Sequence, residues 1–327
     1  MKRRAWLGQL LAGSVAASLS AAPARAQSGF PARALRVVVP FGAGGVADLT
    51  ARTVGSALGD ALGQAVVIDN KPGAGGVTAG EMVARAEPDG HTLLLMSNGT
   101  AVSASLFRNL PFNPRADFAP ISLLGTFELA IVVPQASPHR TLSDLLAWGR
   151  AQTQPLNVGS INIGSTQHLA ATWFCHEARW PAQVVPYNGT PAVLQALRGG
   201  QIDMAVEVLA PMAPQIAAGQ LRLLAVMGEA RVAAHPQVPA VRELPGLSGV
   251  VLSSWNALAA PARTPATVIE RLQHETARVL AQPALVERLA ALGVKARAST
   301  PAQLAQWLDA DIQRWSRVIT TAGIARQ

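Results

Sequence analysis

The sequence contains a single cysteine, Cys175, in 327 residues. One cysteine cannot form a disulfide within the chain, and a chain of this length buries enough apolar surface to fold without one. Unpaired cysteines usually pack as small apolar side chains, so we expect Cys175 to be buried. The cysteine count therefore excludes a framework of internal disulfides.

Long apolar runs are missing after the first residues. No later segment has the roughly 18 uninterrupted apolar residues that a membrane-spanning helix needs. At the start, Lys2-Arg3-Arg4 precede a soft apolar segment, and a small-x-small cleavage site ends at Ala26. These features predict a secretory signal peptide over residues 1–26 and a soluble periplasmic protein. The paired arginines leave both Sec and twin-arginine export open.

Charge is also scarce, since only 14% of the residues are charged. The formal net charge is +8, and four of these charges belong to the predicted leader, which leaves +4. There is no basic run or basic-aromatic interleaving, so nucleic acid is not an expected partner. The six histidines lack metal-ligand spacing, and no G-x-S-x-G elbow is present. We expect no metal, no cofactor and no catalytic residues.

Half of the residues are hydrophobic, and this suits two α/β lobes better than one. Short β-rich segments alternate with helical patterns and glycine-rich turns, which predicts mainly parallel sheets with ligands at the carboxyl ends of their strands. The strand-like segments include 65–68, 92–96, 121–124, 129–133, 157–159, 183–185, 202–206, 221–226 and 255–259. The alternation of strand-like and helical segments begins again near residue 128, as expected where a second lobe starts.

The most informative stretch is VVVPFGAGGVAD, residues 37–48. An apolar strand pattern ends at Pro40 and is followed by a glycine-rich turn and a helical pattern from Leu49. Such a turn leaves backbone N–H groups unpaired at the positive end of the helix dipole. The sequence therefore predicts an anion site at this loop.

Several stretches resemble the Bug-type periplasmic solute-binding proteins, the receptors of tripartite tricarboxylate transporters. They are PARALRVVVPFGAGGVADLTAR, NKPGAGG, EPDGHTLLL, LPFNPRADFAPISLL, NVGSINIGSTQHLA, VPYNGTPAVLQALRGGQIDM and LRLLAV, in this order from Pro31 to Val226. The resemblance implies a type II periplasmic binding protein, or Venus flytrap, with two α/β lobes around a hinged cleft. It also implies that backbone amides and ordered waters in the cleft hold a small carboxylate, either a di- or tricarboxylate or an amino or aromatic acid.

The resemblance and the loop chemistry together give a set of expected ligand-binding residues. Two glycine-containing loops, each ahead of a helix, are expected to bind the ligand from opposite lobes. No arginine side chain is needed to pair with its carboxylates. Strand ends and the segment around residues 203–207 add further candidates. The set is Phe41, Gly42, Ala43, Gly44, Gly45, Asp48, Ser97, Asn98, Ser160, Gly164, Ser165, Thr166, His168, Tyr187, Asp203 and Glu207.

Three positions depart from the family pattern. Asn162 stands where glycine is common, but asparagine tolerates a left-handed conformation. His91 replaces a common aromatic residue, and we expect it on the surface. Glu207 stands where aspartate is common, and its extra methylene could change ligand size or repel a second carboxylate.

The lobes are expected to divide the chain into residues 27–128 with 252–327, and residues 129–251. The hinge is predicted near 126–130, with a return crossing near 252–256. We expect a monomer that hands its ligand to membrane transporter subunits.

Two other functions fit parts of the sequence. A periplasmic ligand sensor with a signalling partner would have the same fold and site. A dinucleotide-binding oxidoreductase is suggested by Gly42-Ala43-Gly44-Gly45-Val46-Ala47 with Asp69 about 20 residues later. The predicted leader argues against the oxidoreductase, and that hypothesis gives the second glycine-containing loop no role.

Overall fold

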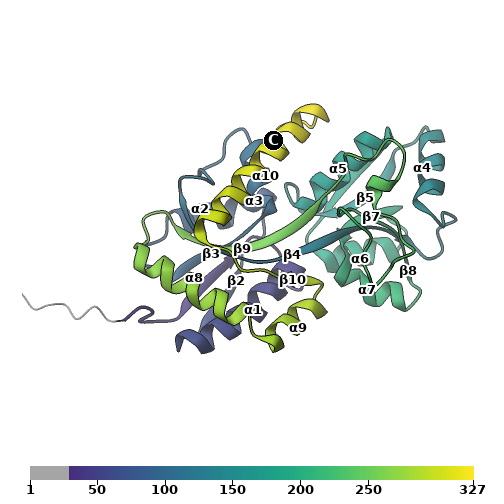
Figure 1. Cartoon of the computed structure of the whole chain (residues 1–327). Coiled ribbons are helices and arrows are strands. Elements are labelled where there is room, and N and C mark those ends of the chain that lie inside the picture. The colour runs from purple at the N-terminus through teal and green to yellow at the C-terminus, as the bar shows by residue number, and fades with distance from the viewer. Residues whose placement is uncertain (1–28) are drawn as a thin grey trace, which may run out of the picture. The chain divides into compact units, whose positions relative to one another are not determined.

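The computed structural model describes residues 29–327, so the predicted leader lies outside the described residues. The chain divides at residue 30, and the unit described below comprises residues 31–327. Strands and helices alternate along much of this unit (Figure 1). The strands are β1 Leu35–Val39, β2 Val66–Asn70, β3 Thr92–Ser97, β4 Phe118–Pro134, β5 Leu156–Ile161, β6 Ala182–Tyr187, β7 Met204–Val208, β8 Leu221–Val226, β9 Ser253–Pro261 and β10 Val294–Ala296.

The helices follow the amphipathic patterns and glycine turns of the sequence. They are α1 Val46–Leu62, α2 Val77–Ala84, α3 Asn98–Leu106, α4 Leu142–Ala151, α5 Thr166–Ala178, α6 Thr190–Arg198, α7 Leu209–Ala217, α8 Ala266–Leu280, α9 Pro283–Ala291 and α10 Pro301–Thr321. Short 3-10 turns cover Ala74–Gly76 and Val241–Glu243.

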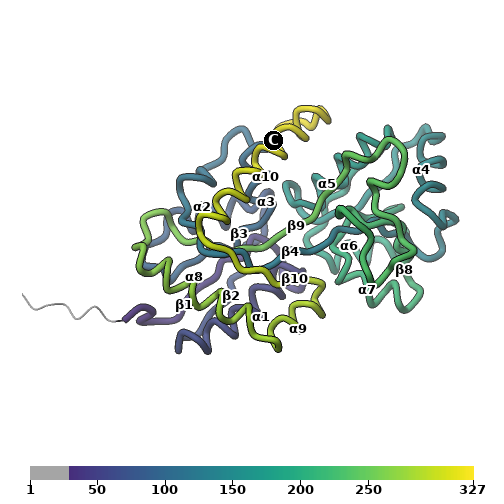
Figure 2. The backbone as a smooth tube through the Cα atoms, viewed as in Figure 1, coloured from purple at the N-terminus to yellow at the C-terminus, as the bar shows by residue number. Residues whose placement is uncertain are grey.

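The strands form two sheets that share β4. In the first sheet the order is β2-β1-β3-β9-β4, with β10 also paired to β4. In the second sheet β4 pairs with both β7 and β8, and β7 continues to β5 and β6. Both sheets carry helices, as the tube in Figure 2 shows. This mixed α/β architecture is the one that the alternating pattern predicts.

The prediction of mainly parallel sheets is only half right. The β1–β2, β1–β3, β5–β6 and β5–β7 pairs are parallel, as expected for strands joined through helices. By contrast, β4 is antiparallel to β7, β8, β9 and β10, and β9 is antiparallel to β3. Because β4 pairs in both sheets and not within one βαβ unit, no crossover helix forces its partners to be parallel to it.

The segments 121–124 and 129–133, expected as separate strand-like segments, belong to one strand of 17 residues, β4. Its pairing with β9 shifts register between Leu123 and Gly125, which marks an irregularity of the β-bulge kind. A bulge bends a strand without ending it, and pairing to β9 continues to Glu128. The predicted hinge at 126–130 therefore lies within a continuous strand, and the residue limits of the lobes stay a prediction.

Two predictions about single residues have clear outcomes. Cys175 is buried on α5, as expected, and burial raises the pKa of its thiol to about 12. The expectation for His91 is wrong, because only 7% of its surface is exposed. Its Nε2 accepts a hydrogen bond from the Ala32 N–H at 3.2 Å, which draws the ring under the chain segment before β1.

Candidate functional site

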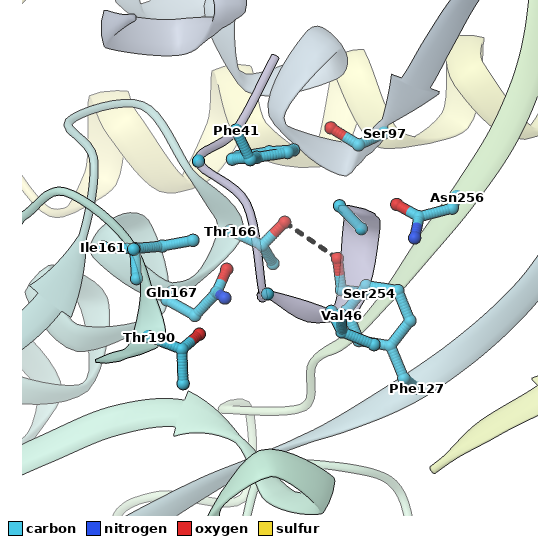
Figure 3. A pocket seen from close by; sticks show the side chains of 14 residues that line it. Phe41, Val46, Ser97, Phe127, Ile161, Thr166, Gln167, Thr190, Ser254 and Asn256 are labelled. Atoms are coloured by element: carbon cyan, nitrogen blue, oxygen red, sulfur yellow. Dashed lines mark hydrogen bonds between the residues drawn. The ribbon is translucent and has the colours of Figure 1, made fainter. Parts of the chain in front are cut away.

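A small pocket lies between residues carried by the two sheets. Its volume is about 30 Å³. One side comes from the loop before α1, from the start of that helix, and from the strands β3, β4 and β9. The other side comes from the end of β5 and from the starts of α5 and α6. The lining residues are Phe41, Gly42, Gly45, Val46, Ala47, Ser97, Phe127, Ile161, Thr166, Gln167, Gly189, Thr190, Ser254 and Asn256 (Figure 3).

The first helix end at the pocket is that of α1. Gly45 is the N-cap and has no side chain to cap the helix, so the first amides lack a partner within it. Asp48 accepts a hydrogen bond from the Gly44 N–H at 3.0 Å and another from Arg52. Burial raises the pKa of Asp48, but its bonds with Arg52, the Gly44 amide and Asn70 outweigh burial and hold that pKa below its usual value. Asp48 thus fixes the loop and remains ionised at neutral pH.

The second helix end is that of α5. The Ser165 hydroxyl accepts from the His168 N–H at 3.1 Å and donates to the Ile161 carbonyl at 2.8 Å. Thr166 and Gln167, the next residues, line the pocket. The Thr166 hydroxyl lies 3.0 Å from the Ser254 hydroxyl on β9 and is hydrogen-bonded to it, as the dashed line in Figure 3 shows. This bond joins an α5 residue to a strand of the first sheet.

The third helix end is that of α6, which was not predicted to belong to the site. Gly189 is its N-cap, with φ +97°, and both Gly189 and Thr190 line the pocket. The turn Tyr187-Asn188-Gly189 ahead of Thr190-Pro191 is a helix-start signal that could have identified it. Three helix N-termini therefore meet at one pocket, and each favours negative charge.

Behind the α5 and α6 starts lies a buried carboxyl group, Glu207. It is 0% exposed, and its Oε1 accepts from Gln167 Nε2 at 2.9 Å and from the Val208 N–H at 2.7 Å. Burial raises the pKa of Glu207, while hydrogen bonds from Gln167, Val208 and Thr190 act against that rise. Glu207 does not line the pocket. It orients two side chains that do, Gln167 and Thr190.

A second buried carboxylate supports the opposite wall. Asp311 on α10 accepts from Trp255 Nε1 at 2.6 Å and from Asn98 Nδ2 at 3.0 Å. Trp315 donates to Asn98 Oδ1. Successive residues of a strand point to opposite faces, so fixing Trp255 on one face of β9 also fixes its neighbours 254 and 256 on the other.

The pocket contains five of the predicted site residues: Phe41, Gly42, Gly45, Ser97 and Thr166. Gly164 and Ser165 instead line a smaller cavity beside it, together with Phe41 and Ser97. Gly75 donates its N–H to the Ile163 carbonyl at 2.6 Å there, which joins the NKPGAGG loop to the loop before α5. Asn162 also lines this smaller cavity.

The remaining predicted residues are not among those that line the pocket. Asn98 is held in the Asp311 network, and Asp203 is exposed and accepts from the Asn157 N–H. Ser160 is fully buried on β5, with its hydroxyl unpartnered among the described residues. The others are Ala43, Gly44, Asp48, Tyr187, His168 and Glu207. Desolvation lowers the pKa of His168 to about 4, so its ring is neutral at pH 7.

Nine residues of the lining were not predicted from the sequence: Val46, Ala47, Phe127, Ile161, Gln167, Gly189, Thr190, Ser254 and Asn256. Val46 and Ala47 come next after the predicted Gly45, and Gln167 follows the predicted Thr166. Extending each loop into the first helical turn would have found them. Ser254 and Asn256 gave no local signal, because β9 reaches the pocket only through its pairing with β3 and β4.

Asp69 does not serve the role that the dinucleotide hypothesis requires. It forms salt bridges with Arg36 and with Lys71, the latter at 3.2 Å, at the end of β2. Within residues 29–327, no cluster of histidine, cysteine, aspartate and glutamate side chains is placed to hold a metal ion. No helix in the same range is both long and apolar enough to cross a bilayer.

Comparisons with known proteins agree with this architecture. A family described as "Tripartite tricarboxylate transporter family receptor" matches residues 50–324. A relative from Pseudomonas sp. strain P51, the UPF0065 protein in the tcbD-tcbE intergenic region, is 34% identical over 313 residues, which cover 95% of this chain and 93% of the relative.

Three solved structures are similar along nearly their whole length. The periplasmic binding protein BugD has a TM-score of 0.86 and 30% identity, covering 91% of this chain and 100% of BugD. MatC from Rhodopseudomonas palustris with bound malate has a TM-score of 0.82 and 32% identity, covering 89% of this chain and 100% of MatC. R. palustris Rpa4515 with adipate has a TM-score of 0.85 and 29% identity, covering 90% of this chain and 99% of Rpa4515.

The family match covers most of the chain, and these likenesses extend over both sheets. They confirm the predicted family and the two-lobed periplasmic binding-protein fold. The chain belongs to the tripartite tricarboxylate transporter receptor family, the family of the Bug proteins.

Proposed function

We propose that this protein is an extracytoplasmic receptor that captures a small carboxylate in the pocket and delivers it to the membrane subunits of a tripartite transporter. The observation that carries the proposal is the meeting of three helix N-termini, those of α1, α5 and α6, at one buried pocket. Unpaired amides and aligned helix dipoles together favour an anion.

The lining favours a carboxylate held by neutral donors. None of the fourteen lining side chains is charged, so no arginine or lysine of the lining forms a salt bridge with the ligand. The hydroxyl of Ser97, which accepts from the Gly99 N–H, still has its proton to add to the amide donors. Phe41, Phe127 and Ile161 supply apolar surface for the carbon skeleton of the ligand.

Ligand entry requires the two sides of the pocket to separate. A volume of about 30 Å³ holds about two water molecules, since each needs roughly 10–15 Å³ measured in this way. We propose that residues 27–128 with 252–327 move as one lobe and 129–251 as the other, about the crossings near 126–130 and 252–256. The support is that β4 and β9 lie side by side there and that β4 pairs in both sheets.

Export, oligomeric state and the absence of catalysis belong to the same proposal. The leader is cut after Ala26, the mature protein acts as a monomer in the periplasm, and it releases its ligand chemically unchanged. The support for a binding role is that the similar solved structures include a periplasmic binding protein and that two of them carry carboxylates.

Calorimetry with matched ligands tests the proposal. Malate, succinate, adipate and citrate are each titrated alongside their methyl esters, which keep the carbon skeleton but lose the negative charge. We expect at least one acid to bind in the micromolar range, about 8 kcal/mol of binding free energy, and its ester to bind at least about 100-fold more weakly. Equal binding of acid and ester, or no binding of any carboxylate in a wider screen, would overturn the proposal.

A further inference from the structure

The side chain of Asn256 has a property that distinguishes it within the pocket. It lines the pocket and is only 1% exposed, yet neither Oδ1 nor Nδ2 has a hydrogen-bond partner among the described residues. Leaving a buried polar atom unpaired costs about 1–3 kcal/mol, so buried amides are nearly always satisfied. A buried carboxamide whose oxygen and nitrogen both lack a partner among the described residues is available to bond a polar group of the ligand.

The strand β9 fixes the position of this side chain. The backbone of Asn256 pairs with Ser97 on β3 and with Gly125 on β4, so it is held from both edges. Ser254, two residues earlier, projects from the same face of the strand. Figure 3 places Asn256 at the same end of the pocket as Ser97. The amide is therefore held in place before any ligand arrives.

The chemistry of an amide limits what can satisfy it. Oδ1 accepts and Nδ2 donates, so its partner must offer a donor next to an acceptor. An ionised carboxylate only accepts, and it would leave Oδ1 unpaired and facing negative charge. A hydroxyl on the carbon beside a carboxylate offers both: its O–H donates to Oδ1, and the neighbouring carboxylate oxygen accepts from Nδ2.

We infer that Asn256 is a specificity-determining residue that selects 2-hydroxycarboxylates over the same acids without the hydroxyl group. This inference rests on the proposed function and adds the class of ligand to it. Ser254 does not share the role, because its hydroxyl is already bonded to Thr166. The helix N-termini bind the carboxylate, and Asn256 forms the hydrogen bond with the hydroxyl group beside it.

The experiment compares acids in pairs that differ by one hydroxyl: lactate with propionate, malate with succinate, and 2-hydroxyglutarate with glutarate. Dissociation constants are measured by calorimetry on the wild type and on Asn256→Leu, which keeps a similar volume without polar atoms. For at least one pair, the wild type should bind the hydroxy acid at least tenfold more tightly. In Asn256→Leu that ratio should fall to within about twofold of one.

Ser254→Ala is the matched control, because it alters the same face of the same strand. It should bind every acid somewhat less tightly and retain the preference for the hydroxy acid. Thermal unfolding of both variants checks that each is folded, and Asn256→Leu should not be destabilised, since it removes an unpaired buried amide.

Each outcome has a defined meaning. Equal binding within the pairs by the wild type overturns the inference, and so does a preference that survives Asn256→Leu. Binding only of acids that lack the hydroxyl, adipate included, overturns it as well. In all three cases the receptor proposal stands. If no carboxylate binds, the proposed function fails and the inference fails with it.

Discussion

Gly44 and Gly164 have nearly the same φ angle but lie in different surroundings. Gly44, before α1, has φ +83°, and Gly164, before α5, has φ +79°. A Cβ on Gly44 would lie 3.9 Å from the nearest atom, Pro191 Cγ. A Cβ on Gly164 would lie 2.7 Å from the Cα of Gly75 in the NKPGAGG loop. The loop before α1 needs glycine only for its own conformation, whereas the loop before α5 also needs it for close contact with another loop.

The largest expected effect comes from exchanging each of these glycines for alanine. Both variants should lose about 1–2 kcal/mol of unfolding free energy, because alanine in a left-handed conformation is strained. Gly164→Ala should also separate Gly75 from Ile163 and keep the two sides of the pocket from meeting. We expect it to weaken carboxylate binding at least about 30-fold, or about 2 kcal/mol, and Gly44→Ala to weaken it less than about fivefold.

Calorimetry and urea unfolding of the two variants measure these effects separately. If both variants lose affinity equally, the contrast between the two loops is wrong, and backbone strain alone explains both. If Gly164→Ala binds as the wild type does, the contact with Gly75 has no part in binding.

The next effect concerns the buried carboxyl groups near the two loops: the pKa of Asp48, at the loop before α1, lies below its usual value, whereas that of Glu207, behind α5, lies above it. Burial raises the pKa of Glu207, so the folded state holds its proton to a higher pH than the unfolded state does. Its contribution to stability is therefore lost as pH rises from the ordinary carboxyl pKa to the raised value. Glu207→Gln removes this loss. Its unfolding free energy should therefore exceed that of the wild type by about 1–3 kcal/mol at pH 8, but by little at pH 4.

Urea unfolding at pH 4, 6 and 8 measures the difference between the variant and the wild type. Glu287→Gln, a change at an exposed position on α9, serves as the control and should follow the wild type at every pH. A difference between Glu207→Gln and the wild type that does not grow with pH would refute the assignment of a raised pKa.

A smaller effect is expected at the hydroxyl pair that links α5 to β9. Thr166→Val keeps the shape of the side chain but removes its bond to Ser254, which should cost about 0.5–1.5 kcal/mol of unfolding free energy. Binding should weaken by about tenfold at most. Ser254→Ala should have a similar effect on stability, and the double variant should lose little more than either one, because both remove the same bond.

The smallest effect is expected for Ser160→Ala. Ser160 was a predicted contact, but its hydroxyl is buried and unpartnered among the described residues, and it does not line the pocket. Its removal should leave affinity unchanged and raise the unfolding free energy slightly, by at most about 1 kcal/mol. A tenfold loss of affinity in calorimetry would show instead that Ser160 contacts the ligand.

The local parts of the site could be predicted from the sequence. The strand, the glycine turn and the start of α1 are consecutive, so periodicity and turn chemistry identify all three together. The same holds for Thr166 at the start of α5. The resemblance to the Bug family added the two-lobed fold, which the comparisons confirm.

The tertiary structure alone decided which distant segments complete the pocket. Asn98 follows Ser97 directly, yet Ser97 lines the pocket and Asn98 bonds to Asp311 on α10. Ser254 and Asn256 reach the pocket because β9 lies between β3 and β4. Periodicity tells which residues are buried, but the order of strands in a sheet depends on pairing between segments far apart in the chain. The order of the strands places Asn256, which has no local signal in the sequence, in the pocket where we infer that it selects the ligand.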